Sequence, residues 1–177
     1  GEMLMKSLIN KIQDIDIHIA FYMTHFYKHH LTNEIMKFIS MCGDFGMSWL
    51  IVILITNMID QTRTMSIDML IALIAATLIG QVTIKSLVRR KRPCHTYPEV
   101  QLLITTPSDL SFPSGHTTSS FACSTVMMLY NPILGIIGYI YAILTAISRL
   151  YLFVHYLSDV VTGVILGITI GIITYLL

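Results

Sequence analysis

Residues 117–148 read TTSSFACSTVMMLYNPILGIIGYIYAILTAIS and contain no charged side chain. A helix that crosses a bilayer needs roughly 20 predominantly apolar residues, because the hydrocarbon core is about 30 Å thick. The pair Asn131-Pro132 divides the stretch, and a proline disfavours helical geometry in the residue before it. The stretch therefore predicts two membrane-spanning helices joined by a tight turn.

The composition of the whole chain agrees with a membrane protein. Of the 177 residues, 54% are hydrophobic and 12% are charged, which is outside the range of ordinary soluble domains. The length leaves room for one compact bundle and for no second domain. We expect an all-α integral membrane helical bundle with about five to six transmembrane helices.

Further apolar segments lie on either side of the central stretch. We expect spans from about Met47 to Ile59, from Ser66 to Val88 and from His155 to Leu177. The stretch from Pro93 to Pro113 carries several prolines and acidic residues and is expected to be an aqueous loop.

The N-terminal region has a different pattern. Residues 1–45 mix apolar and charged side chains and are too polar to cross a bilayer, so they predict amphipathic helices that lie in the membrane interface. Residues 46–177 form the predicted transmembrane core.

Polar motifs gather at one end of the predicted spans. Counting the crossings places the end of the second span, the start of the third, the end of the fourth and the start of the fifth on one membrane face. The three motifs there are Lys85–Pro93 (KSLVRRKRP), Pro113–His116 (PSGH) and Ser148–Asp159 (SRLYLFVHYLSD). Ionisable residues near hydrocarbon are costly unless they are paired or hydrated, and they usually mark a functional site. We therefore expect one composite site.

His155 and Asp159 lie four residues apart, which puts them on one face of a helix. A carboxylate in this position can accept a hydrogen bond from one imidazole nitrogen and leave the other nitrogen free as a nucleophile or a base. The same spacing is typical of a helix start with an ion pair, so the pair alone does not define a catalytic site.

The tetrapeptide Pro113-Ser114-Gly115-His116 opens the third span. Ser114 is suited to cap the helix, and Gly115 lets a ligand approach the backbone, where free N–H groups and the helix dipole favour an anion. His116 beside that anion could protonate a leaving oxygen as a general acid. A plain helix start is the alternative.

Three cations could balance the charge of a phosphoryl group and its transition state. Lys85, Arg92 and Arg149 come from two different span ends. The neighbouring Arg-Arg-Lys of residues 89–91 is expected to be a solvated charge run at the membrane boundary. The three cysteines show neither a C-x-x-C pair nor zinc-ligand spacing, and we expect no metal and no cofactor.

Taken together, the motifs resemble those of the type 2 phosphatidic acid phosphatase (PAP2) family, the membrane branch related to the vanadium haloperoxidases. The resemblance covers about the C-terminal half of the chain, from the second span onward. Three ordered motifs with fixed internal spacing are far more specific than any one of them. The matching residues are Lys85, Arg92 and Pro93 in the first motif, Ser114, Gly115 and His116 in the second, and Ser148, Arg149, His155 and Asp159 in the third.

The resemblance implies metal-independent hydrolysis of a phosphomonoester or a pyrophosphate through a phosphohistidine that water then hydrolyses. His155 would attack phosphorus, Asp159 would orient His155, and His116 would protonate the leaving group. The residues alone leave open which of the two histidines is the nucleophile. The phosphate would be held by Lys85, Arg92, Ser114, Gly115 and Arg149.

A site at the end of membrane spans favours a lipid phosphate over a soluble ester. Undecaprenyl diphosphate, phosphatidylglycerophosphate and phosphatidate are all open as substrates, and we expect the bilayer but no nucleic acid as a partner. Two other functions would use the same site: a phosphotransferase with an acceptor other than water, and a non-enzymatic protein that binds or transports lipid phosphates. In a binding protein, substitution of His155 would leave the function largely intact.

The expected orientation involves a conflict. Ten of the eleven Lys and Arg residues lie on the predicted site side and only Arg63 on the other, so the positive-inside rule favours a cytoplasmic site. The resemblance implies a site on the extracytoplasmic side of a bacterial plasma membrane. The phosphate-binding cations should be left out of the count, and the bias persists even then. We keep the extracytoplasmic site that the resemblance implies.

Overall fold

The computed structural model describes residues 2–177, so Gly1 of the N-terminal region lies outside the described residues. All regular elements in the described part of the chain are helices, as predicted. The α-helices are α1 (Glu2–Thr24), α2 (His30–Cys42), α3 (Met47–Asn57), α4 (Arg63–Ala76), α5 (Lys85–Val88), α6 (Pro93–Thr96), α7 (Gly115–Tyr130), α8 (Pro132–Tyr151) and α9 (Leu157–Leu176). Short 3-10 segments form η1 (His25–Lys28), η2 (Asp44–Gly46) and η3 (Asp60–Thr62), and a π-helical segment forms η4 (Thr77–Ile84).

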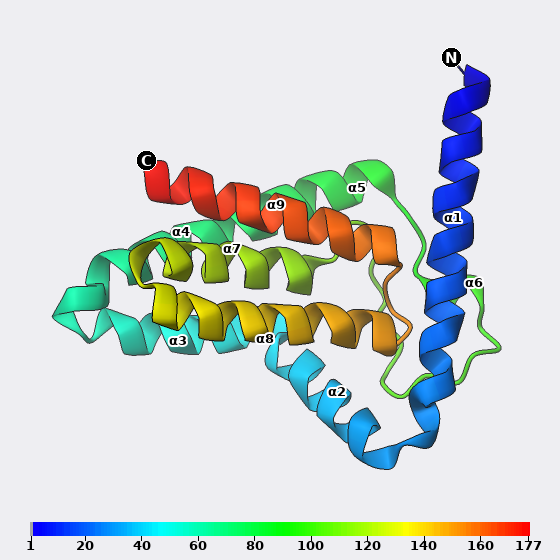
Figure 1. Ribbon diagram of the computed structural model, residues 1–177, viewed down its shortest axis with the longest axis horizontal. Helices are drawn as coiled ribbons and strands as arrows, with labels where there is room; N and C mark the ends of the chain where they lie inside the picture. The colour runs from blue at the N-terminus through cyan, green and yellow to red at the C-terminus, as the bar shows by residue number, and fades with distance from the viewer. Residues whose placement is uncertain (1) are drawn as a thin grey trace.

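Helix α7 lies at the centre of the bundle, with α8 and α9 running alongside it and α4 packed against it (Figure 1). The side chains from Thr117 to Met127 are buried. Three glycines of α9 allow its close approach to α7: a Cβ on Gly167 would lie 2.5 Å from the carbonyl oxygen of Thr118, and one on Gly171 would lie 2.6 Å from Cβ of Thr125. Small residues at such contacts are typical of helix packing in membranes.

The predicted turn between the third and fourth spans is present. Helix α7 ends at Tyr130 and α8 begins at Pro132, whose missing N–H is not needed at a helix start. The side chain of Asn131 caps α8, because its Oδ1 accepts hydrogen bonds from the backbone N–H groups of Ile133 and Leu134 at 3.1 and 3.2 Å.

The number of spans that hydropathy identifies is smaller than the five to six expected. Three helical segments are long and apolar enough to cross a membrane, namely Asp60–Thr96, Pro132–Tyr151 and Leu157–Leu176, and a fourth is obtained if α2 and the helical segment Asp44–Asn57, bent by 53°, count as one. Helix α7 has only 16 residues and carries many Ser and Thr side chains. These side chains pack against neighbouring helices and not against lipid, so α7 need not be apolar. The chain is an integral membrane protein with three to four spans by this measure.

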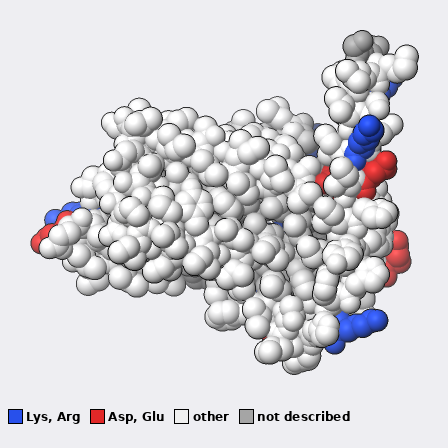
Figure 2. Space-filling view, viewed as in Figure 1, with Lys and Arg blue, Asp and Glu red and all other residues white. Residues whose placement is uncertain are grey.

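Charged side chains on the visible face lie at the two ends of the bundle, with an uncharged band between them (Figure 2). Arg63 and Asp60 form an ion pair of 2.9 Å at the end opposite the three motifs. An uncharged belt between two charged ends is the pattern expected of a bundle that spans a bilayer.

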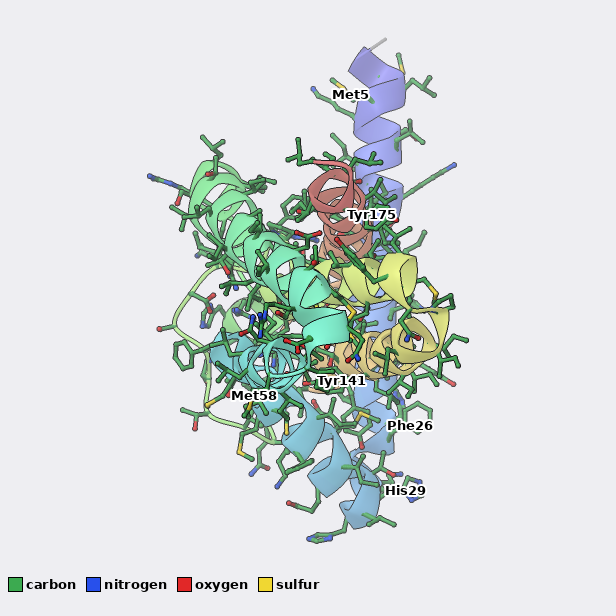
Figure 3. The ribbon with its side chains drawn as sticks, turned by 90° about the vertical axis from the view of Figure 1, so that its left-hand side faces the viewer. Met5, Phe26, His29, Met58, Tyr141 and Tyr175 are labelled. Atoms are coloured by element: carbon green, nitrogen blue, oxygen red, sulfur yellow. The ribbon has the colours of Figure 1, made fainter. Side chains whose placement is uncertain are left out.

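Helix α1 crosses the end of the bundle at a steep angle and extends beyond it (Figure 1). Figure 3 views the bundle from the Met58 end and shows Met5 on the projecting part of α1. Helix α1 packs against α8 and α9 and buries Asp16 and Ala20. Large apolar side chains remain exposed on it, namely Met3, Leu4, Met5, Leu8, Ile9, Ile12 and Ile15.

Candidate active site

The three sequence motifs meet at one end of the bundle, where a cavity of about 1050 Å³ opens. The cavity is lined by six of the eight residues singled out from the sequence: Lys85, Arg92, Gly115, His116, Arg149 and His155. The other two, Ser114 and Asp159, are fully buried beside it. The structure thus brings together side chains from the start of α5, the N-cap of α6, the start of α7, the end of α8, the α8–α9 connection and the start of α9.

His155 lies between α8 and α9 and is only 1% exposed. Its Nε2 accepts a hydrogen bond of 2.9 Å from Nη1 of Arg92, and because a guanidinium cannot accept, the imidazole proton belongs on Nδ1. Nδ1 lies 3.6 Å from Oδ2 of Asp159, and within the described residues it has no hydrogen-bond acceptor. The ring is therefore oriented with Nδ1 toward the carboxylate and Nε2 toward the cations.

The surroundings of His155 favour its neutral form. Burial lowers the pKa of its imidazole well below 6.5, and the positive charges of Arg92, Arg149 and Lys85 lower it further. At neutral pH the lone pair on Nε2 is thus not protonated, which is the state that a nucleophile needs.

Asp159 is the third residue of α9 and is completely buried. Its Oδ2 accepts hydrogen bonds from the hydroxyl of Ser111 and from the backbone N–H of Tyr156, the latter at 2.8 Å. Its Oδ1 accepts a hydrogen bond of 2.6 Å from Nη1 of Arg90. Three donors therefore fix the carboxylate in one orientation.

Asp109, a loop residue before α7, occupies the cation cluster. Nζ of Lys85 donates to its Oδ2 at 2.5 Å, and Nη2 of Arg92 donates to its Oδ1 at 2.6 Å. Burial alone would raise the pKa of Asp109, but the hydrogen bond from Lys85 and the charge of Arg92 outweigh burial and lower the pKa to about 2. The two cations therefore already bind two anionic oxygens at the position expected for phosphate.

Arg149 is the third cation at the cavity. The residue is 3% exposed, and its Nη1 donates a hydrogen bond to the hydroxyl of Ser40 on α2. Its Nε has no acceptor among the described residues. A buried donor without a partner, next to a polar cavity, is suited to an anionic ligand.

The start of α7 differs in one respect from the expectation. Ser114 is the N-cap residue, but its hydroxyl makes no cap hydrogen bond and instead lies 2.9 Å from the hydroxyl of Thr117.

The imidazole of His116 contacts a carboxylate of the N-terminal half of the chain. Its Nε2 donates to Oδ1 of Asp44 at 2.9 Å. Gly43 makes room for this ring, since a Cβ there would lie 2.7 Å from Cδ2 of His116.

The sequence analysis missed several residues of the site. Arg90 is not part of a solvated charge run: it binds Asp16 and Asp159, whereas Arg89 and Lys91 are exposed as expected. A possible signal was the spacing of Arg90 and Arg92, because alternate residues of an extended stretch point to the same side. The other missed residues are Asp16, Ser40, Asp44, Asp109 and Ser111.

The PAP2 superfamily model matches residues 66–177. The undecaprenyl-diphosphatase of Sulfolobus acidocaldarius is 32% identical over 136 residues, which cover 76% of this chain and 65% of that protein. The decaprenylphosphoryl-5-phosphoribose phosphatase of Mycobacterium tuberculosis is 42% identical over 100 residues, which cover 51% of this chain and 49% of that protein. The chain thus spans about half to two thirds of the length of these relatives.

Solved structures show the same fold. The transmembrane PAP2 type phosphatidylglycerolphosphate phosphatase from Bacillus subtilis superposes with a TM-score of 0.76 at 25% identity, covering 93% of this chain and 85% of that one. LpxE of Aquifex aeolicus superposes with a TM-score of 0.79 at 23% identity, covering 90% of this chain and 93% of that one.

The fold and the site define an integral membrane helical bundle with a buried histidine that faces a cluster of cations. The family resemblance of the three motifs is confirmed, because the matching sequence model covers more than half of the chain. The chain belongs to the PAP2 superfamily.

Proposed function

We propose that the protein hydrolyses the phosphate or diphosphate group of a membrane lipid through a phosphohistidine on His155. The observation that carries this proposal is the orientation of His155: its Nε2 lies at the cavity and contacts Arg92, while its Nδ1 faces the buried carboxylate of Asp159. This orientation supports His155 as the nucleophile, a choice that the residues alone left open.

In the first step, the lone pair of Nε2 on His155 attacks phosphorus, and the bond between phosphorus and the leaving oxygen breaks. His116 lines the same cavity and, as an imidazolium paired with the carboxylate of Asp44, gives a ring proton to that oxygen and becomes neutral. The imidazole of His155 becomes positively charged, and the carboxylate of Asp159 accepts its Nδ1–H and stabilises that charge.

In the second step, water attacks the phosphohistidine. His116, which has given up a proton, takes one from the attacking water, the bond between phosphorus and nitrogen breaks, and inorganic phosphate leaves. His155 regains its lone pair and His116 its proton, so the cycle closes without a redox change or a further reactant.

Side-chain cations can balance the negative charge of the phosphoryl group and of its transition state. Lys85, Arg92 and Arg149 converge on the cavity from two span ends. Preorganised cations stabilise the charge of a phosphoryl transition state in a site that excludes water. Gly115 and the start of α7 add backbone N–H groups. The hydroxyl of Ser114 contacts that of Thr117 and so fixes the first turn of α7. We therefore propose that activity needs no metal ion.

The lining of the cavity and the relatives support a lipid substrate with a long hydrocarbon chain. Apolar residues line the cavity beside the cations, among them Met41, Phe45 and Leu73, and Phe45 is almost fully exposed. A polyisoprenyl chain is the leading candidate, because two of the relatives are named for polyprenyl phosphates. Phosphatidylglycerophosphate and phosphatidate are the alternatives to compare with undecaprenyl diphosphate.

The proposed topology has five crossings, with α3, the segment from α4 to α5, α7, α8 and α9 as the spans. Helices α1 and α2, which carry the exposed apolar residues of the N-terminal region, would lie in the membrane interface.

We propose that the site faces the extracytoplasmic side of a bacterial plasma membrane. Four cations counted by the positive-inside rule are engaged inside the site, namely Lys85, Arg90, Arg92 and Arg149. Labelling of a cysteine introduced at Lys91 by an impermeant reagent in intact cells would test this orientation.

The function is tested by phosphate release from purified protein in detergent containing EDTA. Undecaprenyl diphosphate, phosphatidylglycerophosphate and phosphatidate are compared, with His155→Ala as the control. We expect release that survives EDTA and is lost in the variant. Turnover that depends on an added acceptor and yields little free phosphate would indicate a phosphotransferase. Lipid binding without turnover, unchanged in His155→Ala, would indicate a binding or transport protein.

A further inference from the structure

Asp16 is a buried carboxylate on α1, the helix that crosses the end of the bundle. It is 1% exposed, although it lies in the otherwise exposed, amphipathic N-terminal region. Its Oδ1 accepts a hydrogen bond of 2.8 Å from the backbone N–H of Ser158, and its Oδ2 accepts one of 2.5 Å from the hydroxyl of Ser158. A buried charge is costly unless it is paired, so this arrangement needs a counter-ion.

Arg90 is that counter-ion, and it binds a second carboxylate as well. Its Nη2 donates to Oδ2 of Asp16 at 2.6 Å, and its Nη1 donates to Oδ1 of Asp159 at 2.6 Å. The guanidinium also lies over the ring of Tyr156, 4.1 Å from the ring centre. A planar guanidinium can bridge two carboxylates in a fixed geometry, which the ammonium group of a lysine cannot do.

These contacts connect α1 to the nucleophile. Asp159 is bound by Arg90 through Oδ1, and its Oδ2 lies 3.6 Å from Nδ1 of His155. A series of contacts therefore runs from Asp16 through Arg90 and Asp159 to the imidazole of His155.

The charges in this chain matter for catalysis. Two carboxylates and one guanidinium leave one net negative charge beside His155, and that charge can stabilise the positive imidazole of a phosphohistidine. Without Asp16 the cluster would be neutral, because the positive charge of Arg90 would be paired with the carboxylate of Asp159 alone. The electrostatic attraction between the carboxylate of Asp159 and the Nδ1–H of His155 would then weaken.

We propose that Asp16 and Arg90 are positioning residues for the pair of Asp159 and His155. The N-terminal helix α1 thus contributes to the function of the active site through Asp16. The proposal rests on the proposed phosphatase function. Neither residue lines the cavity, so neither is expected to contact the substrate.

The first test compares Asp16→Asn with Asp14→Asn. Asp14 lies two residues away on the same helix and is exposed, so the control removes the same charge without touching the chain of contacts. We expect kcat of Asp16→Asn to fall by roughly 10- to 100-fold, by analogy with the loss seen when the hydrogen-bond partners that orient metal ligands are removed. The KM for the lipid and the inhibition constant of inorganic phosphate should not change, because Lys85, Arg92 and Arg149 are intact.

A merely structural role of Asp16 would give a different result. Asp16→Asn would then lower the melting temperature and the fraction of active molecules, but kcat per active site, measured from the burst of phosphohistidine, would equal that of Asp14→Asn. That outcome would overturn the proposal.

The second test is a double-variant cycle between Asp16 and Arg90. We expect Arg90→Gln to reduce kcat, Arg90→Lys to restore little of it, and Asp16→Asn to cost less in the Arg90→Gln background than in the wild type. The control Lys91→Gln, next to Arg90 but exposed, should retain wild-type kcat. Additive losses in the double variant would mean that the two residues act independently, against the proposal.

The outcomes also separate this proposal from the function on which it rests. A wild-type protein that releases no phosphate overturns the phosphatase function and this proposal with it. An active wild type whose Asp16→Asn and Asp14→Asn variants are indistinguishable in kcat overturns the positioning role alone.

Discussion

Nη1 of Arg92 donates a hydrogen bond of 2.9 Å to Nε2 of His155, the nitrogen that we assign as the nucleophile. The same guanidinium donates to the carbonyl oxygen of Val154 at 2.8 Å and to Asp109 at 2.6 Å. Arg92 thus fixes the tautomer of His155 while it occupies the phosphate side of the cavity. When phosphate binds, the bond to Nε2 must give way so that the lone pair can reach phosphorus.

Substitution of Arg92 by lysine should impair catalysis although the charge is kept. A lysine has no planar fork with which to contact His155, Val154 and Asp109 at once. We expect kcat/KM to fall by about 100-fold, the loss typical of removing one donor that stabilises a transition state. Steady-state kinetics of Arg92→Lys would measure it, with the exposed Arg89→Lys as the control. Equal kcat/KM in both variants would show that charge alone suffices at position 92.

Removal of the negative charge at Asp109 should strengthen phosphate binding. The carboxylate competes with an anion for Lys85 and Arg92, and its pKa of about 2 keeps it ionised at neutral pH. We expect inorganic phosphate to inhibit Asp109→Asn at roughly 3- to 10-fold lower concentration than the wild type, which corresponds to about 1 kcal/mol. The matched control is Glu99→Gln, an exposed residue of the same loop. Weaker inhibition of Asp109→Asn would indicate that Asp109 positions the cations instead of competing for them.

The pH dependence should reflect the neutral state of His155. Burial and then the charges of Arg92, Arg149 and Lys85 lower its pKa well below 6.5. The nucleophile is the unprotonated form, so activity is retained as pH falls below 6.5 and is lost only when pH passes through the lowered pKa. The profile of kcat/KM from about pH 4 to about pH 8 would report this value for the free enzyme. An acidic limb centred at or above pH 6.5 would contradict the assignment of His155.

Close packing of α9 on α7 should make Gly167 sensitive to a single methyl group. A Cβ there would lie 2.5 Å from the backbone oxygen of Thr118, so one helix must move. We expect Gly167→Ala to lower the free energy of unfolding by about 1–3 kcal/mol. Thermal melting in detergent would measure the loss. Gly80→Ala is the control, because its nearest atoms lie at 3.7 Å, and it should melt like the wild type.

The architecture was predictable where a local pattern carries the information. The turn at Asn131-Pro132 and the start of α3 at Met47 follow from a helix breaker next to an apolar run. The three motifs could be placed on one face because spans alternate in direction. The absence of charge predicted a span at α7, although this helix of 16 residues is not among those long and apolar enough to count as spans by hydropathy.

The contacts around Asp159 could not be predicted in the same way. Arg90 and Asp16 are 74 residues apart, and no periodicity links a carboxylate in an amphipathic helix to an arginine in a charge run. Asp109 lies in a stretch whose prolines indicate a loop, and nothing in that pattern shows that the loop folds back on the cations. Such pairs depend on tertiary structure alone.

The burial of α7 has a consequence for how the protein enters the membrane. A helix of 16 residues with six Ser and Thr residues between Thr117 and Thr125 would partition poorly into lipid by itself. We expect α7 to leave the translocon together with α8 as a hairpin, since the turn at Asn131-Pro132 joins them directly. His155 and Asp159 follow later in the chain, so the pair that we propose as catalytic is completed only after this hairpin has been inserted and α9 has joined it.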